Sequence, residues 1–182
     1  ARDIVTRESF ENAITVHAAI SGSTNALLHL PAVAHEFGIH IDGDTFERIH
    51  RNARYLLDVR PTGRWPSEYV YYAGGVPAVM EEIRSLLHLD AMTVTGRTLG
   101  ENLDALKASA YYDRCASLLK KTGLSREDII RPFDRPLGDK GTIEVSIDQV
   151  DGSEEAARTG HPIPAGQLAR IAFRDSGPGI AP

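Results

Sequence analysis

The sequence predicts an α/β fold: a helix-rich, partial α/β/α domain followed by a short antiparallel β segment. Capping residues and apolar residues at helical spacing recur over most of residues 1–139. Two alternating apolar runs follow at 142–148 and 169–173, separated by a stretch rich in Gly, Ser, Glu and Pro. We therefore expect residues 1–139 to be part of a larger α/β domain. Residues 140–182 are expected to form a β-rich tail, which starts a second domain or is a foreign segment.

The first predicted elements are two helices joined by a polar turn. Thr6 can cap a helix that precedes the turn at residues 21–25. A second helix is expected to run to Phe37, with Gly38 as its C-terminal stop and a kink at Pro31, which lacks a backbone donor. Its expected core-facing residues are Leu27, Leu30, Val33, Ala34 and Phe37.

Shorter elements are expected in the rest of the first part. Thr98 with Glu101, and Ser125 with Asp128, have the spacing of a capping box at the start of a helix. The predicted elements are a helix at 44–53, a strand at 55–59, two helical pieces within 67–88 separated at 74–77, a strand at 92–95, and helices at 99–108, at 111–121 and after Ser125.

Composition and charge exclude several classes of protein. The 182 residues are 42% hydrophobic and 25% charged with a net charge of −5, which is typical of a globular domain and argues against a nucleic-acid partner. No apolar segment approaches the ~20 residues that span a bilayer, so no membrane partner is expected. The single cysteine, Cys115, favours a reducing, cytoplasmic location and cannot by itself hold an iron–sulfur cluster. The chain starts at Ala1 without an initiator Met and stops at Pro182, so we expect a fragment.

The turn from Ser21 to Asn25 is the main candidate for a binding site. Gly22 lets the backbone approach a ligand closely, and Ser23, Thr24 and Asn25 supply hydrogen-bonding side chains. The free amides at the start of the next helix could bind a carboxylate or a phosphate. The alternative is a plain helix N-cap, which is the commoner use of such residues.

Two further motifs bear on a metal site and on a nucleotide site. His35 and His40 are five residues apart, whereas the zinc-protease motif needs histidines at i and i+4 on one helical face, so no metal site is predicted. Asp175, Gly177 and Gly179 form a D-x-G-x-G pattern after an alternating run, in which glycines can wrap a nucleotide and the carboxylate can accept from a base. An ordinary Gly-Pro turn is the alternative.

Five blocks in order carry a resemblance to a known family. They are TRESFENAI at 6–14, SGSTNALLHLPAVAHEFGI at 21–39, YYAGGVPAVMEEI at 71–83, LHLDAMTVTGRTLGENL at 87–103 and IIRPFDRPLGDKGTI at 129–143. With these blocks, residues 1–143 resemble the dihydroxy-acid and sugar-acid dehydratases. The resemblance is to the aldonate branch of the family, such as the xylonate dehydratases. It rests on Ser21, where the family usually has Gly, and on the sequence motifs HEFGI and YYAGG.

The resemblance implies a hydro-lyase that converts a 2,3-dihydroxy acid, here a sugar acid such as an aldonate, to a 2-oxo-3-deoxy acid. In the family an iron–sulfur cluster acts on the leaving hydroxyl, Mg²⁺ holds the carboxylate end of the substrate, and a serine alkoxide is the base. The cluster cysteines lie upstream of the matched region, and the serine and a metal-binding glutamate lie downstream. The resemblance therefore implies no catalytic residue and no metal ligand in this chain, which we expect to be inactive alone.

The resemblance also bears on substrate contacts and on assembly. It implies that the turn with Gly22, Ser23, Thr24 and Asn25 lines or supports the site for a small-molecule sugar acid. A homo-oligomer is expected, because a slice of a larger domain leaves apolar faces and strand edges uncovered.

The tail resembles a different family. Residues 142–182 are similar to the ATP-binding domain of sensor histidine kinases, where two antiparallel strands lead to an Asp-x-Gly-x-Gly box. That resemblance implies ATP with Mg²⁺ as the ligand, with Asp175 reading the adenine amino group and Gly177 and Gly179 in the box. A nucleotide-binding module at the C-terminal end is thus the alternative function, and an inactive structural remnant is a third.

Overall fold

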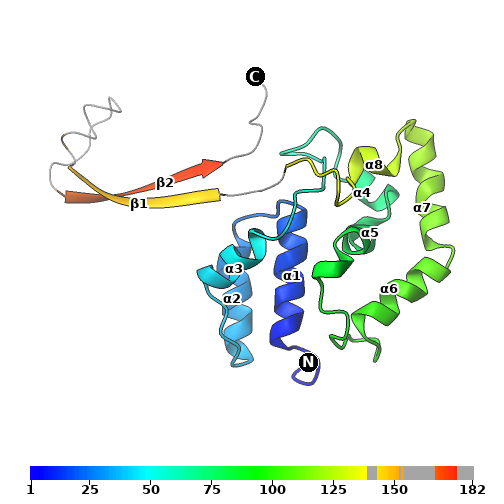
Figure 1. The fold of residues 1–182 in the computed structure, drawn as a ribbon, viewed down its shortest axis with the longest axis horizontal. Helices are drawn as coiled ribbons and strands as arrows, with labels where there is room; N and C mark the ends of the chain where they lie inside the picture. The colour runs from blue at the N-terminus through cyan, green and yellow to red at the C-terminus, as the bar shows by residue number, and fades with distance from the viewer. Residues whose placement is uncertain (139–142, 152, 154–166, 176–182) are drawn as a thin grey trace. The chain divides into compact units, whose positions relative to one another are not determined.

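The computed structural model describes residues 1–138, 143–151, 153 and 167–175, in two compact units that divide after residue 141. The first unit is helix-rich with little strand, which is compatible with part of an α/β domain (Figure 1). Its helices are α1 (Arg7–Ala19), α2 (Ala26–Glu36), α3 (Gly43–His50), α4 (Tyr69–Tyr72), α5 (Gly75–Glu82), α6 (Leu99–Ala108), α7 (Tyr111–Leu119) and α8 (Arg126–Ile129), with 3₁₀ turns η1 (Arg84–Leu86) and η2 (Lys120–Thr122). None of the described helices is long and apolar enough to cross a membrane.

Local capping explains where three of these helices begin. The Thr6 side chain accepts from the Ser9 amide, and the Ser9 side chain accepts from the Thr6 amide, which satisfies two donors at the start of α1. The predicted capping boxes are confirmed for α6, where Thr98 pairs with Glu101, and for α8, where Ser125 pairs with Asp128.

Two hydrophobic clusters form the core of the helical unit, and α1 contributes to both of them. Figure 1 shows α1, α2 and α3 together, and their buried side chains make the smaller cluster. The larger cluster joins the C-terminal half of α1 to the segments around α5, α7 and α8. The smaller cluster contains Phe10, Ile14, Ala34, Ile41, Phe46 and Ile49. The larger contains Val16, Ala19, Leu56, Leu57, Val59, Ala73, Ala78, Val79, Ile83, Leu87, Leu119, Ile129 and Ile130.

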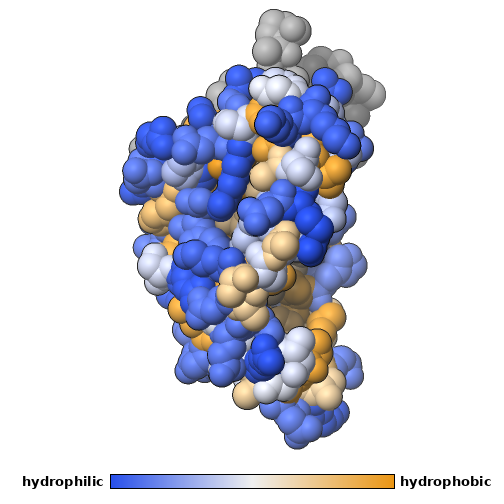
Figure 2. Space-filling model, turned by 90° about the vertical axis from the view of Figure 1, so that its right-hand side faces the viewer, coloured by the Kyte–Doolittle hydropathy of each residue, from blue (hydrophilic) through white to orange (hydrophobic). Residues whose placement is uncertain are grey.

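The predicted inward face of α2 is wrong in part. Leu27 and Val33 are 42% and 49% exposed, and Leu28 is 72% exposed, while Ala34 is buried. Because α2 is apolar on nearly every side, its sequence does not single out one face for the core. Figure 2 shows the face of the molecule that lies on the right-hand side of Figure 1, which is mostly hydrophilic with separate hydrophobic patches.

The two strands predicted in the first part are not formed as strands. Residues 55–59 are extended but make only isolated bridges, such as Leu57 with Ile130. Residues 92–95 form a turn in which the Thr93 amide donates to the Arg97 carbonyl at 3.0 Å and the Gly96 amide donates to Thr93 at 3.1 Å. An alternating run of four residues was too short to outweigh this turn, which Gly96 closes at φ 74°.

The second unit contains β1 (Ile143–Asp151) and β2 (Gln167–Asp175). The strands pair antiparallel, with Ile143 opposite Asp175 and Asp151 opposite Gln167. Asp175 is the last residue of β2, and Gly177 and Gly179 lie outside the described residues. The predicted nucleotide motif therefore stays a prediction.

Candidate functional site

The turn at residues 21–25 leaves α1 through a tight, hydrogen-bonded end. The Gly22 amide donates to the His17 carbonyl at 2.9 Å, and the Ser21 amide donates to the Ala18 carbonyl at 3.2 Å. These two bonds form a Schellman motif, whose penultimate residue takes a left-handed conformation that favours glycine. Ser21 occupies that position with φ 51°, so the backbone path of the turn is fixed although the residue is not glycine.

No side chain caps the start of α2, and its first backbone amides are hydrogen-bonded within the protein. Asn25 precedes the helix with helical dihedral angles, φ −57° and ψ −27°, and its side chain makes no capping hydrogen bond. The amides of Ala26 and Leu27 donate to the Ser23 and Thr24 carbonyls, each at 3.0 Å. The amides of Ala26 and Leu27, which were expected to be free to bind an anion, are therefore hydrogen-bonded within the protein. The side chains of Ser23, Thr24 and Asn25 are exposed, so a ligand at this turn meets side chains first.

His17 supports the turn from the α1 side. Its Nε2 lies 2.9 Å from the Ser23 carbonyl oxygen, and because a carbonyl only accepts, Nε2 carries the proton and donates. The imidazole also packs on Gly22, where an added Cβ would lie 2.2 Å from the His17 Cδ2. Gly22 is thus required by this close approach of a ring to the backbone, a different role from contact with a ligand.

His50, the last residue of α3, stacks on His17. The ring centroids are 5.4 Å apart with an interplanar angle of 27°, and His17 Nδ1 lies 3.4 Å from His50 Nε2. Burial lowers the pKa of His50, and the nearby positive charge that His17 can carry lowers it further. Sequence reasoning missed this pair, because the two residues are 33 positions apart. The only signal was a histidine at a helical spacing otherwise occupied by core residues.

The block at residues 6–14 joins α1 to its neighbours. The Asn12 amide donates to the His88 carbonyl at 3.0 Å, and its oxygen accepts from the His88 backbone amide at 2.8 Å. Glu11 accepts from Arg48 at 2.7 Å and from the His88 ring at 3.0 Å. Burial raises the pKa of Glu11, but these hydrogen bonds and charges outweigh it, so the pKa is lowered. These contacts hold the N-terminal half of α1 against α3 and the segment that contains His88.

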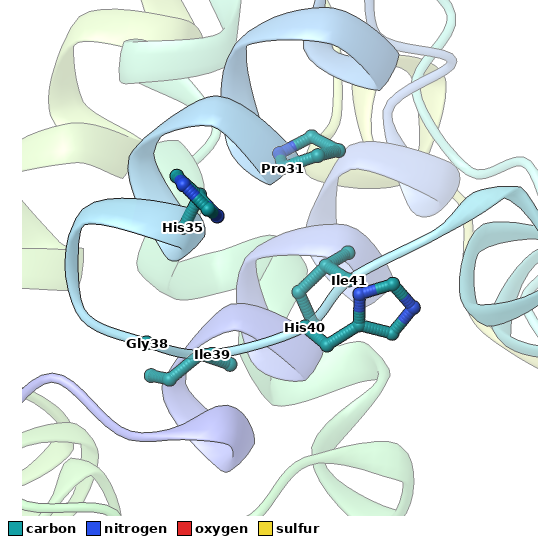
Figure 3. A pocket seen from close by; sticks show the side chains of 6 residues that line it. All are labelled: Pro31, His35, Gly38, Ile39, His40 and Ile41. Atoms are coloured by element: carbon teal, nitrogen blue, oxygen red, sulfur yellow. The ribbon is translucent and has the colours of Figure 1, made fainter.

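The described residues do not fit the iron–sulfur cluster or the Mg²⁺ that the family resemblance implies. Within them, no group of three or more His, Cys, Asp and Glu side chains gathers to hold a metal, and Cys115 is buried. Pro31, His35 and residues 38–41 line a pocket of about 370 Å³, but His35 and His40 lie on different sides of it (Figure 3). His40 Nε2 instead lies 3.2 Å from the Asp42 carboxylate.

Comparison with known proteins supports the dehydratase resemblance and lends no support to the kinase one. Residues 1–102 match the sequence model of the family described as dihydroxy-acid/6-phosphogluconate dehydratase, N-terminal. The chain is 51% identical over 108 residues to dihydroxy-acid dehydratase 1 of Methanosarcina acetivorans, covering 58% of this chain and 19% of that protein. It is 40% identical over 145 residues to the dihydroxy-acid dehydratase of Caldicellulosiruptor saccharolyticus (79% and 23%). It is 46% identical over 139 residues to D-xylonate dehydratase YagF of Escherichia coli (72% and 21%).

The matched region contains the turn, the histidine at its base and the α1 block described above. The chain spans 19–23% of the length of these three relatives. The family match covers more than half of the chain, from the start of the helical unit through the capping box of α6. This chain therefore belongs to the dihydroxy-acid/6-phosphogluconate dehydratase family.

Proposed function

We propose that this chain is part of a dehydratase that converts a 2,3-dihydroxy acid to a 2-oxo acid, and that its substrate is a sugar acid such as an aldonate. Family membership supports the reaction class. The sugar-acid assignment is supported by the presence of D-xylonate dehydratase among the relatives, at 46% identity over 139 residues. The identities to the two dihydroxy-acid dehydratases, 51% over 108 residues and 40% over 145 residues, lie on either side of this value, so the substrate class is decided by the experiment below.

We further propose that the turn at residues 21–25 contacts the substrate. The observation that carries this proposal is the set of exposed Ser23, Thr24 and Asn25 side chains on a turn whose backbone is fixed at both ends. Hydroxyl and amide groups held in this way can hydrogen-bond the hydroxyl groups or the carboxylate of a sugar acid. Metal ligands and the base come from other parts of the complete enzyme, so the chain alone is expected to be inactive.

A chimera tests the reaction and the substrate class together. The matching segment of E. coli D-xylonate dehydratase is replaced by the matched residues of this chain, and formation of 2-oxo acid from D-xylonate is measured. A second chimera places the same residues in the C. saccharolyticus dihydroxy-acid dehydratase. We expect activity in the first host and weaker activity in the second; two folded but inactive chimeras would contradict the proposal, as would 2-oxo acid formation by the isolated chain with aldonates and Mg²⁺.

Substitutions in the active chimera test the turn. Ser23→Ala, Thr24→Val and Asn25→Ala are each expected to raise KM, because each removes a hydrogen-bonding group from the turn. Ser23→Ala also removes the acceptor of the Asn25 backbone amide, which lies 3.3 Å from Ser23 Oγ, so Thr24→Val and Asn25→Ala are the cleaner tests of substrate contact. Ser85→Ala, at an exposed position in η1, is the matched control. Unchanged KM and kcat in all three turn variants would remove the substrate role of the turn.

We also propose that the protein assembles as a homo-oligomer. Leu27, Leu28 and Val33 expose apolar surface on one helix, which favours association when it is not covered.

A further inference from the structure

We propose that His17 is a positioning residue for the turn at residues 21–25, and that His17 and His50 together form a pH-sensitive support that releases this turn when both imidazoles are protonated. The inference rests on the proposed substrate role of the turn only for its effect on activity. The support itself is a property of this chain.

The hydrogen bonds define the protons of the neutral pair. His17 Nε2 donates to the Ser23 carbonyl at 2.9 Å, so in the neutral ring Nδ1 carries a lone pair. That Nδ1 faces His50 Nε2 at 3.4 Å and accepts its proton. The chain of donors therefore runs from His50 through His17 to the backbone of the turn.

One added proton leaves this chain intact. The proton between the two rings can belong to either histidine, and Nε2 of His17 still donates to Ser23. A second proton places hydrogens on both facing nitrogens at a separation of 3.4 Å, with no acceptor between them. It also places two positive charges on rings whose centroids are 5.4 Å apart. The repulsion and the loss of the hydrogen bond between the rings both favour their separation.

Separation of the rings affects the turn because the turn is packed on His17. The imidazole lies directly against Gly22, where even a Cβ would be 2.2 Å from Cδ2, and it holds the Ser23 carbonyl. Movement of the His17 ring therefore removes both the packing partner of Gly22 and the hydrogen bond to Ser23. The side chains at 23–25 lose their fixed positions as a result.

The other charged groups on α1 and α3 near the pair are engaged with partners of their own. α1 contributes His17 and α3 contributes His50, while the turn carries no titratable side chain. Along α3, Glu47 and Arg51 form an ion pair with each other, and Glu11 on α1 is held in the hydrogen bonds described above. Among the described residues, His17 is the charged group that shifts the pKa of His50. Because the pKa of His50 is lowered from 6.5, release is expected below pH 6.5.

Amide NMR of the full chain between pH 8 and pH 5 tests the support directly. In the wild type, the amides of residues 22–25 should shift together below about pH 6.5, and their protection against exchange, relative to the intrinsic rate at the same pH, should fall. His50→Gln removes the second charge, so the turn should stay in place at low pH. His17→Gln keeps an amide donor near Ser23 and does not titrate, so its turn should be independent of pH. His29→Gln, which replaces an exposed histidine on α2, is the control and should titrate like the wild type.

His17→Leu completes the set by removing the donor at every pH. At each pH its turn amides should exchange faster than those of the wild type, with the total helical content from circular dichroism unchanged. If this variant does not fold, His50→Gln and His17→Gln decide the question. A transition that persists in His50→Gln, or protected turn amides in a folded His17→Leu, would overturn the proposal.

Kinetics in the D-xylonate dehydratase chimera separate this proposal from the function of the turn. His17→Leu is expected to raise KM by about tenfold with a smaller change in kcat, and His17→Gln is expected to restore KM to within about twofold. If the NMR result holds but KM does not change, the support stands and the substrate role of the turn is refuted. If the turn amides do not respond to pH or to His17→Leu, the support is refuted whatever the kinetics show.

Discussion

Asn12 offers a sharp test of how the helical unit is held together. It is 6% exposed and makes two hydrogen bonds to the backbone of His88, one as donor and one as acceptor. A buried group left without its partner costs about 1–3 kcal/mol, so loss of both bonds in Asn12→Leu should lower the free energy of unfolding by about 3 kcal/mol. Asn12→Asp keeps the shape and the acceptor but replaces the donor by a charged oxygen, so it should cost at least as much at pH 7.

The assay is urea unfolding followed by the fluorescence of Trp65, the single tryptophan, which packs against the larger cluster. As the pH falls, the new carboxyl is protonated and can donate to the His88 carbonyl. The difference in the free energy of unfolding between Asn12→Asp and the wild type should therefore become smaller. Asn52 provides the matched control, because its exposed amide also donates to a backbone carbonyl, that of Arg48, at 3.0 Å. Asn52→Asp should change stability by no more than about 0.5 kcal/mol. Equal effects at the two positions would refute the reasoning.

Three further predictions concern the turn, the acid range and assembly. Gly22→Ala should destabilise the chain by about 1–3 kcal/mol because the new Cβ overlaps the His17 ring. Gly43→Ala is the control, because its added Cβ would meet nothing within 4 Å. This variant should have an unchanged or higher melting temperature. Glu11 has a pKa lowered from 4.5, so its contribution is present above pH 4.5 and is lost as the pH falls through the lowered value. Glu11→Gln should therefore flatten the acid side of a plot of stability against pH, and an unchanged slope would contradict this. Leu28→Glu should reduce self-association in light scattering, and a wild-type chain that is already monomeric would count against the apolar face of α2.

Local signals in the sequence predicted the helix starts well. The pairs Thr98 with Glu101 and Ser125 with Asp128 act over three residues, so their geometry depends little on the rest of the fold. The facing of α2 could not be predicted in the same way. Leu27 and Val33 are as apolar as residues that are buried elsewhere, and only the placement of α1 and α3 decides which side of α2 is covered.

In the candidate site, too, features set by neighbouring residues could be predicted from the sequence, whereas contacts between distant residues could not. The sequence pointed to the polar turn, to a close backbone approach at Gly22, and to helix-terminal amides that either bind an anion or belong to a plain N-cap. Those amides bond the carbonyls of the turn itself. The stacking of His17 on His50 depends on how α3 packs against α1, which the spacing of residues along either helix does not encode.

Cys115 gives the helical unit a chemical probe of its own motion. It is the only thiol in the chain, it lies on α7, and it is 2% exposed. A thiol reagent in solution reaches its sulfur only when the packing around this part of α7 opens. The rate of its modification therefore measures how often the packing around this part of α7 opens in the native protein, and it does so without any engineered label.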